Sequence, residues 1–409
     1  MRYVFVGDDF TGASDTLATL ARAGLKVRLF REVPSPEEVA GLDAFGLATH
    51  ARAMGPEELA DLLRDIGPAL AAHNPQILHV KVCSTFDSSA KIGNFVTLAE
   101  GLAEATGIVD LAVLGGQPSL GRYAVFGTLF AKGPDGFVHR IDRHPVMSCH
   151  PVTPMCEADL TRHLGALGLC GLHLVPRGAQ GERFPRLYDA LEQGDITAVG
   201  RDLFSAPGPV LVIGASSVAE AWLASLGITE GTASVASPPD RAPTARPVFA
   251  FAGSRSSVTT AQIAAASGYW RLPVNPADMM AAGAALAEAR RWAEERLERG
   301  ESCLIYLTAD HAGEISPAEL ARAAADFVAD VLVGRTLGGL VVAGGDTSGA
   351  IVQRLAIRWL DYEAQVCAGV PLLTCDGPFG PLDLALKGGQ MGPRDFFDQA
   401  MSLLQRRTR

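Results

Sequence analysis

The stretch YVFVGDDFTGASDTLATLARA, residues 3–23, decides the fold. A short apolar run, Tyr3–Val6, leads into the polar loop GDDFTGAS, and an Ala- and Leu-rich run follows from about Ala13 to Ala23. Apolar run, small polar loop and helical run recur in this order along the chain, which indicates repeated βα units and a parallel sheet with helices on its faces. Ligands of such sheets bind beyond the carboxyl ends of the strands, so the loops there are the candidate sites.

Six further apolar runs are expected to form strands, and each leads into a loop rich in small or polar residues. They are Ile77–Val82, Leu111–Leu114 and Val210–Ile213 in the first half, and Val248–Phe251, Cys303–Leu307 and Leu340–Val342 in the second. Between the halves, residues 228–247 are poor in large apolar side chains and rich in Pro, Ala, Ser and Thr, which is typical of a linker. The sequence therefore predicts two α/β domains with mainly parallel sheets facing each other across a cleft: residues 1–230 and 248–409, joined by a linker over 231–247.

The composition limits the partners. The 45 acidic and 35 basic side chains leave a net charge of −10 on 409 residues, which argues against nucleic acid, because affinity for a polyphosphate backbone comes mainly from clustered Lys and Arg. Seven cysteines without a CxxC pair favour a reducing, cytoplasmic location over a disulfide framework or a zinc site. No apolar run approaches the roughly 18 residues of a membrane span, so no membrane partner is expected.

Two adjacent carboxylates follow the first strand. Asp8 and Asp9 precede Thr11 and Gly12 at the start of a helical run. Carboxylates beside exposed helix amides are able to orient a polyol, hold a metal or accept a proton. The structural alternative is that Asp9 or Thr11 only caps the helix, but a cap needs one acid and the sequence has two. Asp8 and Asp9 are therefore candidate catalytic residues, and Thr11 is a candidate substrate-binding residue.

The second motif, KVCSTFDSS at residues 81–89, contains a cation, an acid and four hydroxyls. Such density suits a small, oxygenated anion. Helix capping would explain Asp87 and the serines, but not a lysine within a strand, where an unpaired charge is costly. Only five of the 35 basic residues are lysines, so Lys81 indicates a site that needs a compact point charge. Asp87 is a candidate catalytic residue, and Lys81, Ser84 and Thr85 are candidate substrate-binding residues.

Two regions could add basic groups to this site. Arg122 is a candidate substrate-binding residue, with a structural ion pair as the alternative. Residues 140–155 break the βα rhythm with three prolines and two His-Pro steps, which favour extended or turn backbone. A loop of that length is commonly functional. Its histidines, His144 and His150, either join the site or bond to the backbone of the loop.

The second half carries glycine-rich turns that suit phosphate. AGGDTSG at residues 343–349 follows a predicted strand and precedes a helical run from Ala350. Bare amides at a helix N-terminus are able to cradle phosphate oxygens, and Gly-Gly permits close approach. GSRSS at 253–257 and KGGQMG at 387–392 are further loops of this kind. Neither GxxxxGKS/T nor a GxGxxG after the first strand occurs, which excludes a Walker-type NTPase and an ordinary dinucleotide-binding domain.

Six dispersed motifs together resemble the four-carbon acid sugar kinase family. They are GDDFTGASDT, KVCSTFDSS, HPVTPM, AGGDTSGA, AGVP at residues 368–371 and LALKGGQMGPRDFF, and they follow the family's order from about Tyr3 to Phe397. The resemblance implies a two-domain enzyme that phosphorylates 3-oxo-tetronate, threonate, erythronate or a related acid with ATP. It also implies that the N-terminal domain binds the acid and that the C-terminal domain binds ATP.

The family's functional positions are carried over one by one. The acid contacts fall on Asp8, Asp9, Lys81, Ser84, Thr85, Asp87 and Arg122, and the nucleotide contacts fall on Ser254, Ser256, Gly344, Gly345, Asp346, Thr347 and Gly389. Three motifs depart from the family's pattern. Asp346 stands where many members have Glu, Pro118–Arg122 reads PSLGR instead of PENGR, and Gly388–Gly392 reads GGQMG instead of SGNFG. The second departure bears on which acid is bound.

We therefore expect an ATP-dependent kinase acting on a hydroxyl of a small four-carbon sugar acid. Domain closure would align the hydroxyl with the γ-phosphate and exclude water, while Mg2+ neutralises the phosphates. Asp8, Asp9 or Asp87 orients or deprotonates the hydroxyl, and the sequence does not choose between them. Metal ligands are not assigned, Asp346 being one option, and a homo-oligomer is left open. The alternatives are a sugar-acid dehydrogenase or isomerase and a non-catalytic sugar-acid-binding protein.

Overall fold

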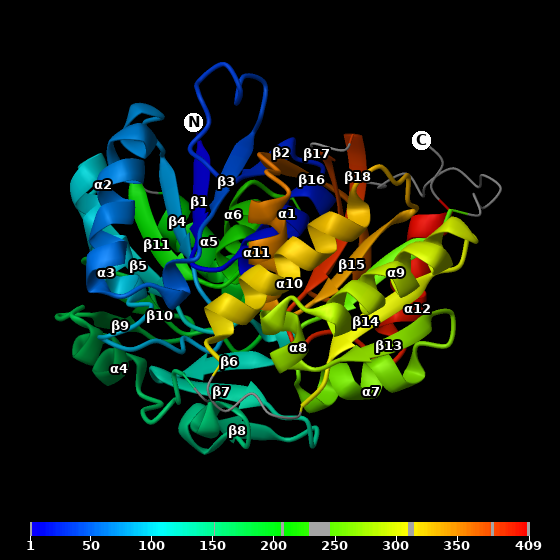
Figure 1. Cartoon of the computed structure of the whole chain (residues 1–409). Helices are drawn as coiled ribbons and strands as arrows, with labels where there is room; N and C mark the ends of the chain where they lie inside the picture. The colour runs from blue at the N-terminus through cyan, green and yellow to red at the C-terminus, as the bar shows by residue number, and fades with distance from the viewer. Residues whose placement is uncertain are drawn as a thin grey trace. The chain divides into compact units, whose positions relative to one another are not determined.

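The computed structural model describes residues 2–150, 152–205, 208–228, 246–309, 315–377 and 380–406 (Figure 1). The chain divides into two compact units, Met1–Ala233 and Ser234–Arg409. Each unit contains a mainly parallel sheet and helices, so the prediction of two α/β domains is confirmed. The predicted linker lies outside the described residues except for its last two positions.

The first unit is built on a parallel sheet in the order β2-β3-β1-β4-β11-β5-β10-β9. Its strands are β1 (Tyr3–Gly7), β2 (Val27–Phe30), β3 (Ala44–Ala48), β4 (Ile77–Lys81), β5 (Asp110–Leu114), β9 (His173–Val175), β10 (Arg186–Tyr188) and β11 (Val210–Gly214). The four central strands β3, β1, β4 and β11 are buried along their whole length, as is usual for parallel strands covered on both faces. Strands β2, β3, β9 and β10 are additions to the predicted set.

Helices and a small second sheet complete the first unit. The helices are α1 (Phe10–Arg22), α2 (Pro56–Ala72), α3 (Phe95–Thr106), α4 (Leu160–Leu167), α5 (Gln193–Phe204) and α6 (Ser217–Ser225), with short 3-10 turns η1 (Ala51–Ala53), η2 (Pro118–Leu120), η3 (Ile141–Arg143) and η4 (Met147–Cys149). An antiparallel sheet is formed by β6 (Arg122–Val125), β7 (Thr128–Lys132) and β8 (Val138–Arg140). The irregular segment 140–155 follows β8 and contains only two of the short turns before α4.

The second unit has a mixed sheet in the order β13-β14-β12-β15-β18-β17-β16. Its strands are β12 (Val248–Ala252), β13 (Trp270–Val274), β14 (Cys303–Leu307), β15 (Gly339–Ala343), β16 (Trp359–Cys367), β17 (Val370–Gly377) and β18 (Gly380–Lys387). Its helices are α7 (Ser257–Ala265), α8 (Pro276–Ala281), α9 (Ala284–Glu298), α10 (Pro317–Leu332), α11 (Gly345–Arg354) and α12 (Phe396–Gln405). Neighbouring strands in the series β13-β14-β12-β15-β18 are parallel. Strands β16, β17 and β18 form an antiparallel meander that the sequence did not predict.

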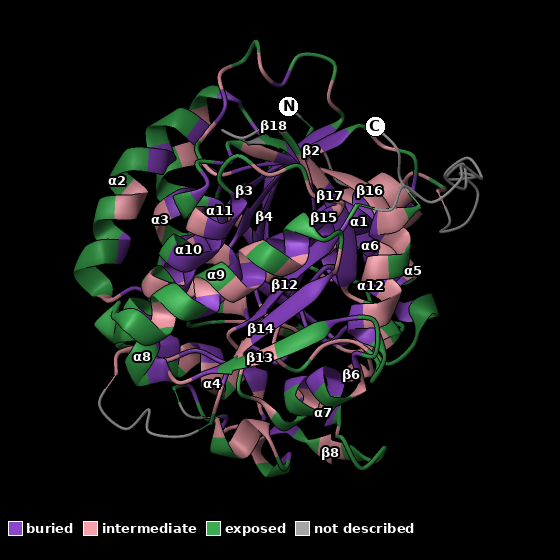
Figure 2. Cartoon of the chain, turned by 45° about the vertical axis from the view of Figure 1, so that its right-hand side comes forward, coloured by how far each residue is buried: buried purple, intermediate pink, exposed green. Residues whose placement is uncertain are grey.

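The core of the second unit lies between its sheet and helices such as α12. Phe396, Phe397 and Leu404 of α12 are fully buried against residues of β12 and β15, including Val248 and Val341. Figure 2 shows most strands in purple, as buried, and much of the exposed green colour on helices and loops. The core thus fixes the strands whose carboxyl ends carry the glycine-rich loops.

Two helices begin earlier than the sequence predicts. Helix α1 starts at Phe10 and not near Ala13, because the side chain of Asp9 caps it by accepting from the amide of Gly12 at 2.8 Å. Helix α11 starts at Gly345 and not near Ala350. Candidate residues expected in loops therefore lie in the first turn of each helix.

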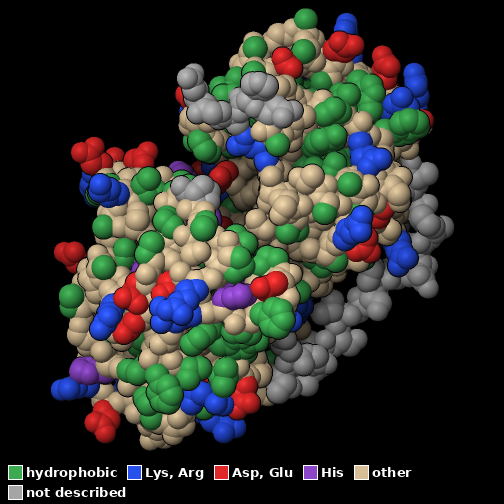
Figure 3. Space-filling view, turned by 90° about the horizontal axis from the view of Figure 1, so that it is seen from below, with side chains coloured by type: hydrophobic (Ala, Val, Ile, Leu, Met, Phe, Trp, Pro, Cys, Tyr) green, Lys and Arg blue, Asp and Glu red, His purple; other side chains and the backbone are tan. Residues whose placement is uncertain are grey.

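Helix composition and surface charge bear on the expected partners. No helix in the described ranges is both long and apolar enough to cross a membrane. On the face that Figure 3 shows, Lys and Arg side chains are scattered among Asp and Glu, without a continuous basic field. On this face, the cations are interspersed with acids and do not form the kind of cluster that binds a nucleic-acid backbone.

Candidate active site

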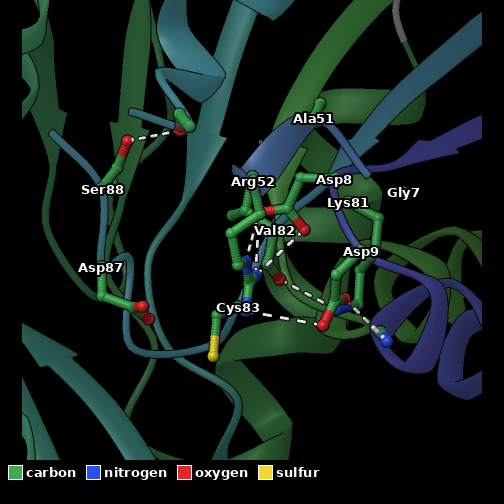
Figure 4. A network of polar contacts seen from close by, with 12 residues as sticks. Gly7, Asp8, Asp9, Ala51, Arg52, Lys81, Val82, Cys83, Asp87 and Ser88 are labelled. Carbon is green, nitrogen blue, oxygen red and sulfur yellow. Dashed lines mark hydrogen bonds and ion pairs between the residues drawn. The ribbon is translucent and has the colours of Figure 1, made fainter. Parts of the chain in front are cut away.

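Two of the predicted motifs meet where β1 and β4 end (Figure 4). The strands are paired so that Gly7 lies beside Lys81, the last residue of β4. The amide of Asp8 donates to the carbonyl oxygen of Lys81 at 3.0 Å. Asp8, Asp9 and Lys81 therefore lie together at the carboxyl edge of the sheet.

Arg52, which the sequence reasoning missed, lies at the centre of this group. It belongs to η1, in the loop after β3, and its guanidinium binds both carboxylate oxygens of Asp8, with Nη2 at 2.8 Å from Oδ2 and 3.0 Å from Oδ1. Its Nη1 lies 3.6 Å from Oδ2 of Asp9. The signal that could have found it was the short apolar run Ala44–Ala48 followed by a polar loop, since a strand there would end beside β1.

The two adjacent carboxylates differ in protonation behaviour. Asp8 is 2% exposed, and burial, opposed by Arg52 but reinforced by Asp9, raises the pKa of Asp8 to about 6. Burial also disfavours ionisation of Asp9, but Arg52, Lys81 and two hydrogen bonds outweigh burial and lower the pKa of Asp9. Asp9 is consequently the more firmly ionised of the pair.

Asp9 caps α1, as the structural alternative supposed, and remains accessible. Its Oδ1 accepts from the amide of Gly12, and its Oδ2 accepts from the hydroxyl of Thr11 at 3.1 Å. The side chain is still 26% exposed. Because a carboxylate has about four lone-pair sites, capping leaves it able to accept a further hydrogen bond.

Lys81 approaches the same helix start. It is 4% exposed, and its Nζ donates to the carbonyl oxygen of Val82 at 2.8 Å. A Cβ added to Gly12 would lie 2.4 Å from Oδ1 of Asp9 and 2.9 Å from Nζ of Lys81. Glycine at this position therefore makes room for an anion-cation pair, and two of the three N–H donors of Lys81 are left for other acceptors.

Asp87 is held by hydroxyl groups from two loops. Its Oδ1 accepts from Thr85 at 2.5 Å, and its Oδ2 accepts from Thr153 at 3.0 Å. Burial opposes the charge of Asp87, but Arg52 and these hydroxyls outweigh burial and lower its pKa. Ser84 is half-buried in the same loop. Asp87 is thus linked electrostatically to the group around Arg52.

Thr153 brings the irregular segment 140–155 to the site. Its amide donates to Nδ1 of His150 at 3.1 Å, and its hydroxyl reaches Asp87. The charge of His150 is also among the influences that lower the pKa of Asp87. Sequence reasoning singled out the histidines of this segment; Thr153 lies in the HPVTPM motif but was given no role in the site.

Arg122 and His144 lie in a different setting. Arg122 begins β6, and its Nη1 donates to the carbonyl oxygen of Leu120 at 2.6 Å. His144 accepts at Nδ1 from the amides of Val146 and Met147, which is the backbone bonding that the sequence left as its alternative. Within the described part of the chain, no hydrogen bond or ion pair joins Arg122 to Asp8, Asp9 or Asp87.

In the second unit, the loops after β12, β15 and β18 converge. The amide of Gly253 donates to Ala343, and the amide of Gly344 donates to Lys387, at 2.9 and 2.8 Å. A Cβ added to Gly253 would lie 2.1 Å from Oγ1 of Thr347. A Cβ added to Gly389 would lie 2.5 Å from Oγ of Ser254, so the three loops are in close contact.

Two helix N-termini open into this convergence. Ser256 caps α7 by accepting from the amide of Thr259 at 3.1 Å, and its hydroxyl donates to the carbonyl oxygen of Gly389 at 2.6 Å. Gly344, with φ of +131°, precedes α11, whose first turn contains Gly345, Asp346 and Thr347. Asp346 is exposed and Thr347 is buried. Paired helix N-termini with bare amides and hydroxyls are able to bind a phosphate chain.

Comparison with known families matches each unit to a function. Residues 3–222 match the model of a sugar-binding N-terminal domain, and residues 249–397 match that of a nucleotide-binding C-terminal domain. The network around Arg52 lies within the first match, and the converging glycine-rich loops lie within the second.

Curated relatives are similar along nearly the whole chain. A 3-oxo-isoapionate kinase of Paraburkholderia graminis is 33% identical over 96% of this chain and 92% of its own length. A 3-oxo-tetronate kinase of Methylobacterium radiotolerans is 32% identical over 98% of both chains.

Solved structures share the fold. A protein of Salmonella typhimurium LT2 has a TM-score of 0.78 at 22% identity and covers 99% of each chain. A Haemophilus influenzae protein has a TM-score of 0.70 at 23% identity, covering 98% of this chain and 100% of that one.

Proposed function

The chain belongs to the four-carbon acid sugar kinase family, and on this premise we propose that it transfers the γ-phosphoryl group of ATP to a hydroxyl of a four-carbon sugar acid. The observation that carries the proposal is the placing of two cations, Arg52 and Lys81, beside Asp9 at the carboxyl edge of the sheet in the sugar-binding unit. The cations are suited to bind the carboxylate of such an acid, and the carboxylate of Asp9 is suited to accept a hydrogen bond from its hydroxyl.

The substrate's carboxylate is bound by Lys81 and by the outer nitrogen of Arg52. Lys81 has two N–H donors left after its bond to Val82. Nε and Nη2 of Arg52 donate to Asp8, and Nη1 is the nitrogen that faces Asp9. A small acid in this position would replace water on both cations and lie against Ser84 and Thr85.

Asp9 is the group that orients and deprotonates the acceptor hydroxyl. Asp8 is bound through both of its oxygens by Arg52, and Asp87 is buried, with 5% of its surface exposed. Asp9 is partly exposed and ionised. In the transfer, the hydroxyl oxygen forms the new P–O bond, the bond from the γ-phosphorus to the bridging oxygen breaks, and the hydroxyl proton passes to Asp9.

ATP is bound by the second unit through backbone amides and hydroxyls. The first turns of α7 and α11 and the loop at Gly389 supply donors for the phosphates. Among the described residues, no cluster of three His, Cys, Asp or Glu side chains is arranged to hold a metal. Mg2+ usually binds through phosphates, waters and one or two carboxylates, and Asp346 is the carboxylate in the first turn of α11 that fits this role. When bound, Mg2+ neutralises the phosphate charge.

The cysteines suit a reducing, cytoplasmic location. Cys83, Cys149, Cys156, Cys170, Cys303, Cys367 and Cys375 are all free thiols. Disulfides persist mainly in oxidising compartments.

A coupled assay of ATP consumption tests the proposed function. The purified chain is screened against threonate, erythronate, their 3-oxo forms, 3-oxo-isoapionate and 4-hydroxythreonate with Mg2+ present. Turnover with one of these acids, and formation of its phosphate ester by mass spectrometry, is the expected result. Binding of an acid without ATP consumption would instead make the chain a sugar-acid-binding protein, and NAD-dependent turnover would make it a dehydrogenase.

A further inference from the structure

Lys387 is a fully buried cation of the second unit. It ends β18 and has 0% of its surface exposed. Its Nζ donates to Oγ1 of Thr259 at 3.1 Å and to the carbonyl oxygens of Gly388 and Gly389 at 3.0 and 3.5 Å. In the described ranges, none of the ion pairs involves Lys387. A buried ammonium is costly unless it is paired.

Burial and one neighbour, Cys367, are the influences that act on the charge of Lys387. On β16, Cys367 is a thiol whose pKa burial raises to about 11, and the ring of Phe396 lies 5.6 Å from Nζ. Asp398 on α12 is bonded to the amides of Ser267 and Gly268. The other titratable groups on the elements packed nearby are Asp346 and Arg354 on α11, Asp361, Tyr362 and Glu363 on β16, Cys375 and Asp376 on β17, Asp383 on β18, and Arg394 and Asp395 before α12. Burial accordingly lowers the pKa of Lys387 to about 8.

The direction of the loop amides is set by the bonds of Lys387 together with the hydroxyls of Ser256 and Thr259, which donate to the carbonyl oxygen of Gly389 at 2.6 and 2.9 Å. In a trans peptide, the carbonyl and the N–H point to opposite sides. Because the carbonyls of Gly388 and Gly389 turn toward Nζ, the N–H groups of Gly389 and Gln390 turn away from it. Neither amide donates to another backbone group of the described chain. Two adjacent free amides in a glycine loop form a concavity of the kind that binds anions.

We propose that Lys387 is a positioning residue of the nucleotide site: it holds the amides of Gly389 and Gln390 toward the phosphates, and those phosphates stabilise its positive charge, so that nucleotide binding takes up a proton at Lys387. The inference rests on the proposed function, because it requires the second unit to bind a nucleotide. Lys387 does not contact the phosphates itself, since its three donors are already directed to Thr259, Gly388 and Gly389.

Calorimetry with ADP tests the inference without turnover. The heat of binding is measured in pairs of buffers with different ionisation enthalpies, which gives the number of protons taken up. Starting from a pKa of about 8, binding should take up close to one proton at about pH 9 and about a tenth of a proton at pH 7. The ADP phosphates are fully ionised at the higher pH and do not contribute there.

Three variants separate positioning from general destabilisation. Lys387→Met should abolish the uptake and weaken ADP binding about ten- to hundredfold, because it removes hydrogen bonds from a charged donor. Lys387→Arg keeps a permanent charge and should bind ADP without uptake. Lys132→Met, which changes an exposed lysine of β7, should behave as the parent protein.

The outcomes are distinguishable. Uptake by the parent protein that disappears in both Lys387 variants supports the inference. ADP binding with no uptake at about pH 9 overturns the inference and leaves the proposed function standing. Failure of the parent protein to bind ADP or ATP at any pH overturns the proposed function and the inference with it. If Lys387→Met does not fold, the parent protein and Lys387→Arg still decide between these outcomes.

Discussion

The two units manage charge in opposite ways. In the first unit, Asp8 and Arg52 form a bidentate pair, and the carboxylate of Asp9 and the ammonium of Lys81 both lie close to the position that a Cβ of Gly12 would occupy. In the second unit, one buried cation, Lys387, has no carboxylate beside it, and the other donors are amides and hydroxyls. On the proposed function, the site for the small acid contains both cations and carboxylates that already balance each other in the free protein. A site for a highly charged nucleotide leaves that balance to the ligand and its metal.

The largest expected effect comes from removing the reactive charge of the first unit. Asp9→Asn keeps the cap on α1, since an Asn side chain also accepts from the amide of Gly12, but it cannot take the proton of the hydroxyl. We expect kcat to fall by about 10²- to 10⁴-fold, while the Kd for ADP is unchanged. Single-turnover kinetics and calorimetry measure these two quantities.

The matched control is Asp61→Asn, which removes an exposed carboxylate of α2 that pairs with Arg64. It should leave kcat within about twofold, because surface substitutions have small effects. Equal kcat values for Asp9→Asn and Asp61→Asn would remove Asp9 from the chemistry and erase the contrast between the units.

The second effect is on the pH dependence of stability. The pKa of Asp8 lies at about 6 in the folded protein, above its usual value of 3.8, so the folded state binds more protons between these values than the unfolded chain does. Stability contributed by protonated Asp8 is therefore lost as the pH rises through about 6. Relative to the parent, the unfolding free energy of Asp8→Asn should rise by about 2 kcal/mol between pH 4 and pH 7.

Urea denaturation across this pH range measures the difference. Asp61→Asn again serves as the control, with an offset that does not change with pH. If the difference in unfolding free energy between Asp8→Asn and the parent is also constant with pH, Arg52 holds Asp8 ionised across the whole range. The effect of Arg52 on the pKa of Asp8 would then outweigh the effect of burial.

The smallest of the three expected effects is a loss of ATP affinity in the second unit. In Gly389→Ala, the new Cβ would lie 2.5 Å from Oγ of Ser254 and push the loops apart. Affinity for ATP should fall about tenfold, or roughly 1.4 kcal/mol, with binding of the sugar acid unchanged. Gly283→Ala is the matched control, because its Cβ would meet no atom within 4 Å. Equal Kd values in the two variants would exclude Gly389 from the nucleotide site.

The fold was predictable where one strand is a continuous apolar run. All seven predicted strands, such as Cys303–Leu307, are present to within one residue at each end. The strands that were missed are short or atypical. Ala44–Ala48 contains Gly46, and the ring of Phe5 packs where a side chain of residue 46 would lie, since an added Cβ would be 2.1 Å from Cζ of Phe5. The antiparallel β16 and β17 carry mixed sequences that a search for βα units passes over.

The candidate site was predictable from residues that follow the recognised strands, and less so beyond them. Asp8, Asp9 and Lys81 are brought together because β1 pairs with β4. Arg52 was missed because its strand was missed, and Thr153 because its bond to Asp87 spans 66 positions. Arg122 was assigned to the substrate site from its charge and from the family resemblance; its observed hydrogen bond is to the carbonyl oxygen of the neighbouring Leu120, and its role in the site stays a prediction. Contacts that depend on tertiary register leave no local pattern to read.

The hydrogen bond between Thr153 and Asp87 has a consequence for how substrate choice changes over evolution. It joins the segment 140–155 to the site through one pair of side chains, and no strand of the large sheet runs through that segment. If the acid binds near Asp87, as the proposed function has it, new sequences in this segment would change its surroundings without altering the register of any strand of the large sheet. The segment around Thr153 can therefore vary in sequence while the sheet stays the same. Variants that act on a different acid are best selected from libraries randomised around Thr153.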